Sequence, residues 1–187
     1  MSRRRVLRLA LAGGLWLVVT GHSPYRQWEV YRKIRLVVLV SAEDAASVQL
    51  GQAIAGLLAK HLPESRAMMS RARDTNDLVR LIASKQLDTA LMREEDAAAA
   101  FRGAGRFADN GAIPLCGLAQ FGSHLFVCRD DFPRPNAYQL AETLAEQWQD
   151  VDPALPSRAR GPKPISSGPV PIHPGALEYY ADHPPRD

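Results

Sequence analysis

The side chains best suited to hold a ligand are three arginines, Arg71, Arg73 and Arg93, which follow short apolar segments. A guanidinium group can hold a carboxylate through two parallel hydrogen bonds, so these residues suit a small carboxylate ligand. Acidic residues directly follow two of them, at Asp74 and Glu94. The same arginines can therefore serve either a ligand or ordinary ion pairs in solvent, and we favour the ion pairs.

Four further polar residues, Ser41, Glu43, Asp44 and Thr75, complete the candidate ligand site. Like the arginines, they lie close to the ends of segments that are expected to be strands. Glu43 and Asp44 also precede an expected helix, where a carboxylate accepts hydrogen bonds from the first backbone N–H groups. We therefore expect these two residues to cap that helix rather than to contact a ligand. Thr75, or Asp74 beside it, is available to cap the next helix.

No motif in the sequence indicates an enzyme or a metal site. The chain lacks G-x-S-x-G, the P-loop and G-x-G-x-x-G, and its five histidines form no H-E-x-x-H or similar ligand pair. Two cysteines are too few for a zinc site or a disulfide scaffold. Apart from the arginines near the N-terminus the chain is close to neutral, so nucleic acid is not an expected partner. We expect no catalysis, no metal and no cofactor.

Apolar runs typical of buried strands alternate with segments of helical spacing. The expected order is strand 35–40, helix 44–61, strand 67–70, helix 76–84, strand 87–92 and helix 94–102. This alternation implies right-handed crossovers and a three-layer α/β fold, with a mostly parallel sheet covered on both faces. Ligands of such sheets lie beyond the carboxyl ends of the strands, which is where the candidate residues fall.

Residues 115–120 and 123–129 predict two more strands around Gly122. A hairpin centred there places Cys116 opposite Cys128, which leaves either a disulfide or two buried thiols. An amphipathic helix over 136–149 follows. From Val151 onward the chain carries nine of its fourteen prolines, so residues 151–187 are expected to form an extended arm. We expect the apolar end of this arm to dock on the domain as a short helix.

The N-terminal segment has the pattern of an export signal. A basic stretch over residues 1–8 precedes an apolar run over 9–20, which is too short to span a bilayer comfortably. Residues 1–21 are therefore expected to be a signal peptide or an uncleaved membrane anchor. A single α/β domain at 30–150 and the proline-rich arm follow, and the expected location is the periplasm.

Three segments together resemble TAXI-type solute-binding proteins, the extracytoplasmic receptors of tripartite ATP-independent periplasmic (TRAP) transporters. Residues 171–180, PIHPGALEYY, are similar to the family's closing P-[IL]-H-P-G-A-x-x-Y-Y. Residues 78–92 resemble its N-L-R-x-L-x-S-G-E-A-D-L-A-L-V, and residues 125–138 resemble its L-L-V-x-R-x-D-L-P-x-x-x-x-Y. The resemblance implies a fold like one lobe of a type II periplasmic binding protein. It also implies a small organic acid or amino acid as ligand and transporter membrane subunits as partners.

The chain also departs from the family pattern. Family members have two lobes that close around the ligand, and the segment expected to form the second lobe is missing between residues 112 and 123. The family's glycine-rich first loop matches only at Leu50 and Gly51. Two hypotheses follow. The protein is either a reduced receptor that binds weakly or with a partner, or a periplasmic interaction or assembly protein that kept the scaffold and lost ligand binding.

Overall fold

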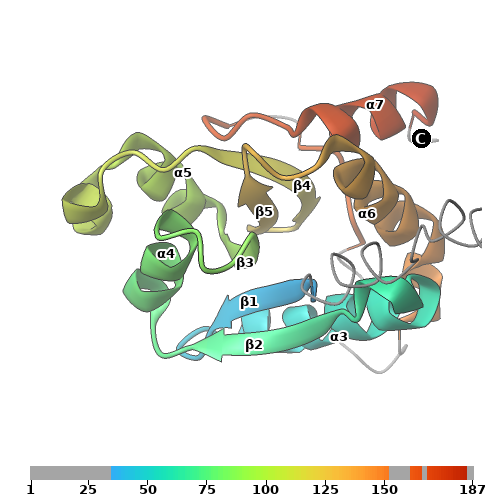
Figure 1. Cartoon of the computed structure of the whole chain (residues 1–187), viewed down its shortest axis with the longest axis horizontal. Helices are drawn as coiled ribbons and strands as arrows, with labels where there is room; N and C mark the ends of the chain where they lie inside the picture. Colours follow the sequence, from blue (N-terminus) through green and yellow to red (C-terminus); the bar gives the residue numbers. More distant parts are fainter. Residues whose placement is uncertain (1–34, 152–160, 166–167, 185–187) are drawn as a thin grey trace, which may run out of the picture. The chain divides into compact units, whose positions relative to one another are not determined.

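A five-stranded mixed sheet lies at the centre of the domain (Figure 1). The computed structural model describes residues 35–151, 161–165 and 168–184. Its strands are β1 (Val37–Ser41), β2 (Met68–Ala72), β3 (Thr89–Arg93), β4 (Leu115–Phe121) and β5 (His124–Arg129). The strand order is β2-β1-β3-β5-β4, in which β5 alone runs antiparallel to its neighbours. The expected α/β class with a mostly parallel sheet is confirmed.

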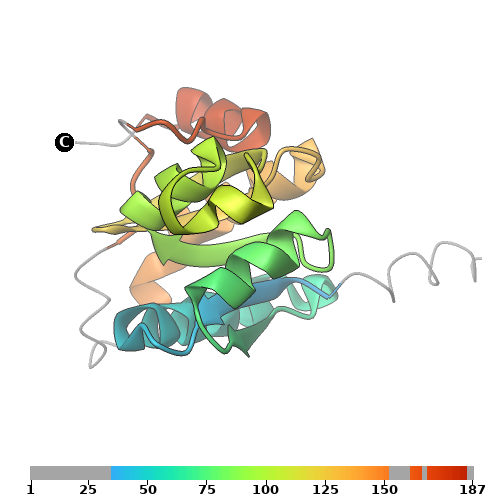
Figure 2. The same cartoon turned by 90° about the vertical axis from the view of Figure 1, so that its left-hand side faces the viewer.

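Helices cover both faces of the sheet. One face packs against α3 (Ala45–His61), α6 (Arg134–Gln147) and α7 (Pro174–Asp182). The other packs against α4 (Thr75–Ala83), α5 (Glu94–Arg102) and the short 3₁₀ helix η2 (Gly105–Asn110). Figure 2 views the molecule from the side of α4 and α5. Two shorter 3₁₀ helices, η1 (Pro63–Ser65) and η3 (Trp148–Asp150), follow α3 and α6.

Strand β1 shows why the apolar run predicts a strand buried on both faces. Val38 and Val40 belong to the core under α3 and α6, whereas Leu39 belongs to the core under α4 and α5. Successive side chains of a strand point to opposite faces, so a continuous apolar run fills both cores. Gly51 then lets α3 pack closely on this strand, because an added Cβ atom would lie 2.5 Å from Cγ1 of Val40.

The predicted hairpin is present, and it changes the sheet. Strands β4 and β5 are joined by the two residues Gly122 and Ser123, with Gly122 at a φ of 61°. Strand β5 enters the sheet between β3 and β4, so the last part of the sheet is antiparallel. No second lobe is inserted at this turn.

The two cysteines lie opposite each other in this hairpin, as the sequence predicts. Cys116 pairs with Cys128 in the register of β4 and β5, and both are buried free thiols. Burial raises the pKa of each thiol, most strongly for Cys128. A buried thiol with a raised pKa is poorly reactive.

The described part of the C-terminal arm docks along the outer edge of β4 (Figure 1). Lys163 and Gln120 exchange two backbone hydrogen bonds of 2.9 Å, and the backbone of Gly117 bonds to Pro171 and His173 on either side of Ile172. An uncovered edge strand presents unpaired N–H and C=O groups to other chains. The arm therefore completes the sheet on this side.

The HPGA motif explains how α7 begins. His173 is the N-cap, and its Nδ1 accepts a hydrogen bond of 3.1 Å from the Gly175 backbone while its Nε2 donates one of 3.0 Å to the Phe132 carbonyl. Pro174 occupies the first helical position, where proline is favoured. Gly175 lies against α6, since an added Cβ would be 2.2 Å from the Arg134 carbonyl oxygen. The motif is thus accounted for by packing of α7 on α6.

Acidification should weaken the domain through His173. Burial, together with the nearby charge of Arg134, lowers the pKa of His173 from 6.5. The unfolded chain therefore takes up a proton before the folded chain does, and stability present above pH 6.5 is lost as the pH falls towards the folded pKa. Urea denaturation at about pH 7.5 and about pH 5.5 should show this loss, with a slope of at most about 1.4 kcal/mol per pH unit. His173→Asn keeps a capping oxygen without titrating, and an equal pH dependence in that variant would contradict the assignment.

The expected export segment, residues 1–21, lies outside the described residues, as do residues 152–160, 166–167 and 185–187 of the proline-rich arm. Within residues 35–151, 161–165 and 168–184, no helix combines the length and apolar character needed to cross a membrane.

Candidate functional site

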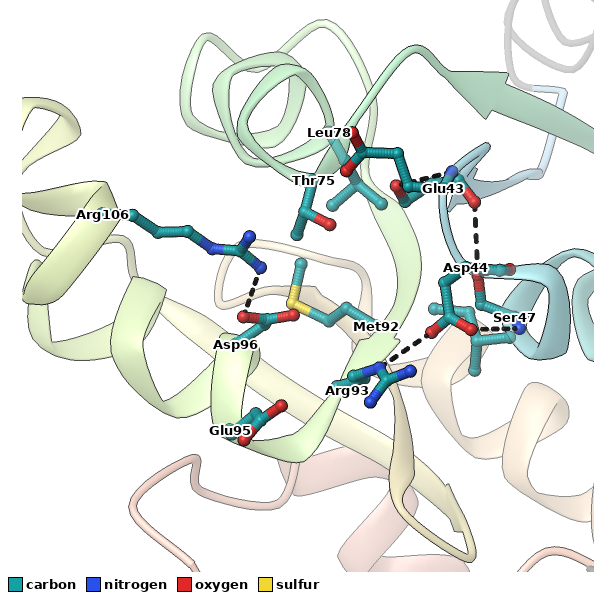
Figure 3. A pocket seen from close by; sticks show the side chains of 12 residues that line it. Glu43, Asp44, Ser47, Thr75, Leu78, Met92, Arg93, Glu95, Asp96 and Arg106 are labelled. Carbon is teal, nitrogen blue, oxygen red and sulfur yellow. Dashed lines mark hydrogen bonds and ion pairs between the residues drawn. The ribbon is translucent and has the colours of Figure 1, made fainter.

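A pocket of about 220 Å³ opens at the carboxyl ends of β1 and β3 (Figure 3). Strands β2 and β3 lie on opposite sides of β1, so the chain reverses its direction of winding here. Ligands of open α/β sheets bind at such a switch point, beyond the strand ends. The lining residues come from these strand ends and the starts of α3, α4 and α5, with one from η2: Ser41, Glu43, Asp44, Ser47, Thr75, Leu78, Leu91, Met92, Arg93, Glu95, Asp96 and Arg106.

Five of the seven residues proposed from the sequence line this pocket: Ser41, Glu43, Asp44, Thr75 and Arg93. The other two lie outside its lining. Arg71 is exposed on β2, which is an edge strand of the sheet. Arg73 is exposed as well, and its Nε donates a hydrogen bond of 3.0 Å to Asp74. Asp74 is also the N-cap of α4, so Arg73 is held at the helix start as a surface ion pair.

Asp44 is the most connected residue of the pocket. Its Oδ1 accepts hydrogen bonds from the backbone of Ala46 and Ser47, which makes it the N-cap of α3 as predicted. Its Oδ2 accepts from His124 Nε2 at 2.8 Å and from Arg93 Nε at 3.2 Å. Burial acts to raise the pKa of Asp44, but the bonds to His124, Ser47 and Arg93 outweigh it and lower the pKa. Asp44 therefore remains a carboxylate that ties α3 to β3 and β5.

His124 was missed by sequence reasoning because it belongs to no motif. It is buried at the start of β5, directly opposite Arg93 of β3 in the strand register. Only the pairing of the hairpin with β3 could have revealed it. The neighbouring Ser123 Oγ lies 3.4 Å from His124 Nδ1, so Ser123, His124 and Asp44 have the residue types of a hydrolase triad.

This triad-like chain does not face the pocket. Neither Ser123 nor His124 lines the cavity. The Ser123–His124 contact of 3.4 Å is also longer than the roughly 2.6–3.2 Å typical of an activated nucleophile and its base. We therefore assign His124 to holding Asp44 in place.

A second ion pair closes the other side of the pocket. Arg106 Nη2 lies 2.5 Å from Asp96 Oδ1, and the guanidinium also lies over the ring of Phe107 at 4.9 Å from its centroid. Asp96 comes from the first turn of α5 and Arg106 from η2. Both lining arginines, Arg93 and Arg106, are therefore already paired with carboxylates inside the pocket.

Thr75 is a buried polar residue of the pocket whose side chain has no partner among the described residues. The residue is only 8% exposed, yet its hydroxyl makes no hydrogen bond to any described residue. In Figure 3 the hydroxyl points into the pocket, between Asp96 on one side and the Glu43–Asp44 loop on the other. Most buried polar groups are hydrogen-bonded, so an unpaired one at a cavity wall indicates a place for a bound group.

The residues around the pocket are not arranged for metal binding. Among the described residues, no three His, Cys, Asp or Glu side chains are grouped so that they could hold a metal ion. What the pocket offers instead is carboxylate oxygens, hydroxyl groups and a small apolar floor of Leu78, Leu91 and Met92. This composition suits a small polar organic molecule.

No family model matches this chain, and no curated protein sequence matches it.

Proposed function

We propose that this chain is a reduced, one-lobed relative of TAXI-type solute-binding proteins that acts as a small-molecule receptor in the periplasm. Its sheet would then correspond to one lobe of a type II periplasmic binding protein. The observation that carries the proposal is the pocket at the β1–β3 switch point, which brings together five residues proposed from the sequence. The docked HPGA segment is compatible with this origin.

A one-lobed receptor exposes much of its ligand. Good small-molecule sites bury about 70–90% of the ligand surface, whereas here β4 passes directly into β5 through a two-residue turn. We therefore propose weak binding by the chain alone, with a transporter membrane subunit or another periplasmic protein supplying the second wall.

A second candidate function is that of a periplasmic interaction or assembly protein. The arginines of the pocket are both paired, and Arg71 and Arg73 lie exposed outside it. This arrangement leaves no unpaired guanidinium in the pocket for a carboxylate ligand, and it places the guanidinium of Arg71 on a surface that a protein partner could reach.

Calorimetric titration of the full chain with amino acids, dicarboxylates and amines tests the receptor proposal. We expect one class to bind at a single site, and Glu95→Trp to abolish the heat because its ring fills the pocket. Glu146→Trp, on the exposed side of α6, is the matched control and should bind normally. Absence of binding by every class would contradict the receptor and leave the interaction protein as the better explanation.

A further inference from the structure

We propose that the pocket takes the ammonium group of a short aliphatic amine. This inference rests on the proposed receptor function and names the ligand class of the same pocket. The inferred ligand group is an ammonium, whereas the arginines in the sequence suggest a carboxylate. Three features of the pocket support the ammonium: its charge balance, the hydroxyl of Thr75, which is unpaired among the described residues, and its apolar floor.

The pocket holds more negative than positive charge. Four carboxylates line it, at Glu43, Asp44, Glu95 and Asp96, against the guanidinium groups of Arg93 and Arg106. The two arginines neutralise Asp44 and Asp96 through contacts of 3.2 and 2.5 Å. Two carboxylates therefore remain in excess, and an incoming anion would meet repulsion.

Neither excess carboxylate has an ion-pair partner among the described residues. Glu43 and Glu95 are both exposed at the rim. Arg73 lies within electrostatic range of Glu43, but its hydrogen bond goes to Asp74. His124, the remaining basic group near the pocket, is directed to Asp44. Glu43 and Glu95 are thus available to a cation from solution.

Helix capping explains part of the acidic character but not all of it. Asp44 caps α3, and Glu95 and Asp96 lie in the first turn of α5, where negative charge is favoured by the helix dipole. Capping gives no reason for the buried hydroxyl of Thr75 at the start of α4, which is unpaired within the described part of the chain. An ammonium group carries three N–H donors, which a hydroxyl oxygen and carboxylate oxygens can accept.

The size and floor of the pocket indicate a short alkyl stem on the ligand. Leu78, Leu91 and Met92 supply apolar surface beneath the polar rim. The volume of about 220 Å³ is smaller than the roughly 300–1,000 Å³ typical of drug-sized ligands. A chain of a few methylene groups ending in an ammonium group matches both properties.

Three ligands of equal carbon chain length test the inference: 1,4-diaminobutane, 4-aminobutanoate and butanedioate. Calorimetric titration of the full chain at low salt should give the tightest binding for the diamine and at least about tenfold weaker binding for butanedioate. Tighter binding of butanedioate than of the diamine would overturn the ammonium inference while leaving the receptor proposal intact. If none of the three binds but another compound does, this inference alone fails; if nothing binds, both fail.

Two variants connect the binding to named groups. Glu43→Gln and Thr75→Val should each weaken diamine binding by about fivefold to tenfold, whereas Glu64→Gln, at an exposed site on η1, should leave it unchanged. Thr75→Val preserves side-chain shape and removes a hydroxyl without a partner, so the variant should melt at the same temperature as the wild type or higher. Unchanged diamine affinity in both folded variants would place the amine elsewhere and contradict the inference.

Discussion

Replacing Gly175 with alanine should lower the free energy of unfolding by about 2–3 kcal/mol. The new methyl group would lie 2.2 Å from the Arg134 carbonyl oxygen and 3.0 Å from the Tyr138 backbone nitrogen. Both contacts are with the backbone of α6, which cannot rotate away as a side chain can. Helix α7 must therefore move off α6, which disturbs the cap made by His173. Urea denaturation followed by circular dichroism measures the change.

Gly56→Ala is the matched control for this substitution. Gly56 lies inside α3, is exposed, and has no atom within 4 Å of an added Cβ. Alanine is favoured over glycine inside a helix by roughly 0.5–1 kcal/mol, so this variant should be more stable than the wild type. If the two alanine substitutions changed stability in the same direction, close packing of α7 on α6 would not be what requires glycine at position 175.

Asp44→Ala should lower the free energy of unfolding by about 2–3 kcal/mol, because the Asp44 side chain both caps a helix and accepts a hydrogen bond from a buried histidine. The substitution removes the acceptor for Ala46 and Ser47 at the start of α3. It also leaves His124, which is buried, without its partner at 2.8 Å. Thermal and urea unfolding of the variant measure the loss.

Asp44→Asn separates the two roles of this residue. Asparagine caps helices about as well as aspartate. This variant should therefore lose only the part of the stabilisation that depends on the charge of Asp44, roughly 1 kcal/mol. Because the pKa of Asp44 is lowered below 3.8 in the fold, that part is present above this pH and disappears as the pH falls through the folded pKa. A loss as large in Asp44→Asn as in Asp44→Ala would show that capping contributes little.

The elements of the fold could be predicted wherever local signals agree. The helix expected at 94–102 is observed with the same bounds, because carboxylates mark its first turn and Gly103, with a φ of 62°, ends it. The continuous apolar run before Ser41 similarly predicts β1, since both of its faces are buried. These features depend on residues close together in sequence.

The position of β5 could not be predicted, because it depends on pairing between distant segments. Alternation along a strand says which side chains are buried, but it does not say which strand lies beside which. The insertion of β5 between β3 and β4 places His124 next to Asp44. The same reasoning explains why His124 was missed.

Only part of the candidate site could be predicted, because the sequence shows which residues lie near strand ends but not which side chains meet in the fold. The sequence places Ser41, Thr75 and Arg93 near the ends of expected strands. The order of strands and helices predicts that a ligand binds beyond those ends, so these residues could be proposed. Arg106 and Asp96 meet only through the fold of η2 against α5, which no local pattern encodes. Arg71 lies near an expected strand end in the sequence, but in the structure it is exposed on the edge strand β2 and does not line the pocket.

The docked arm has a consequence for the timing of folding during synthesis. The five described strands lie between residues 37 and 129, so they leave the ribosome before Lys163 and Ile172, which pair with the edge of β4. During that interval the nascent sheet exposes unpaired backbone groups along β4, and chains on neighbouring ribosomes can pair there. The edge of β4 is therefore covered only after the segment that precedes the HPGA motif has also been made.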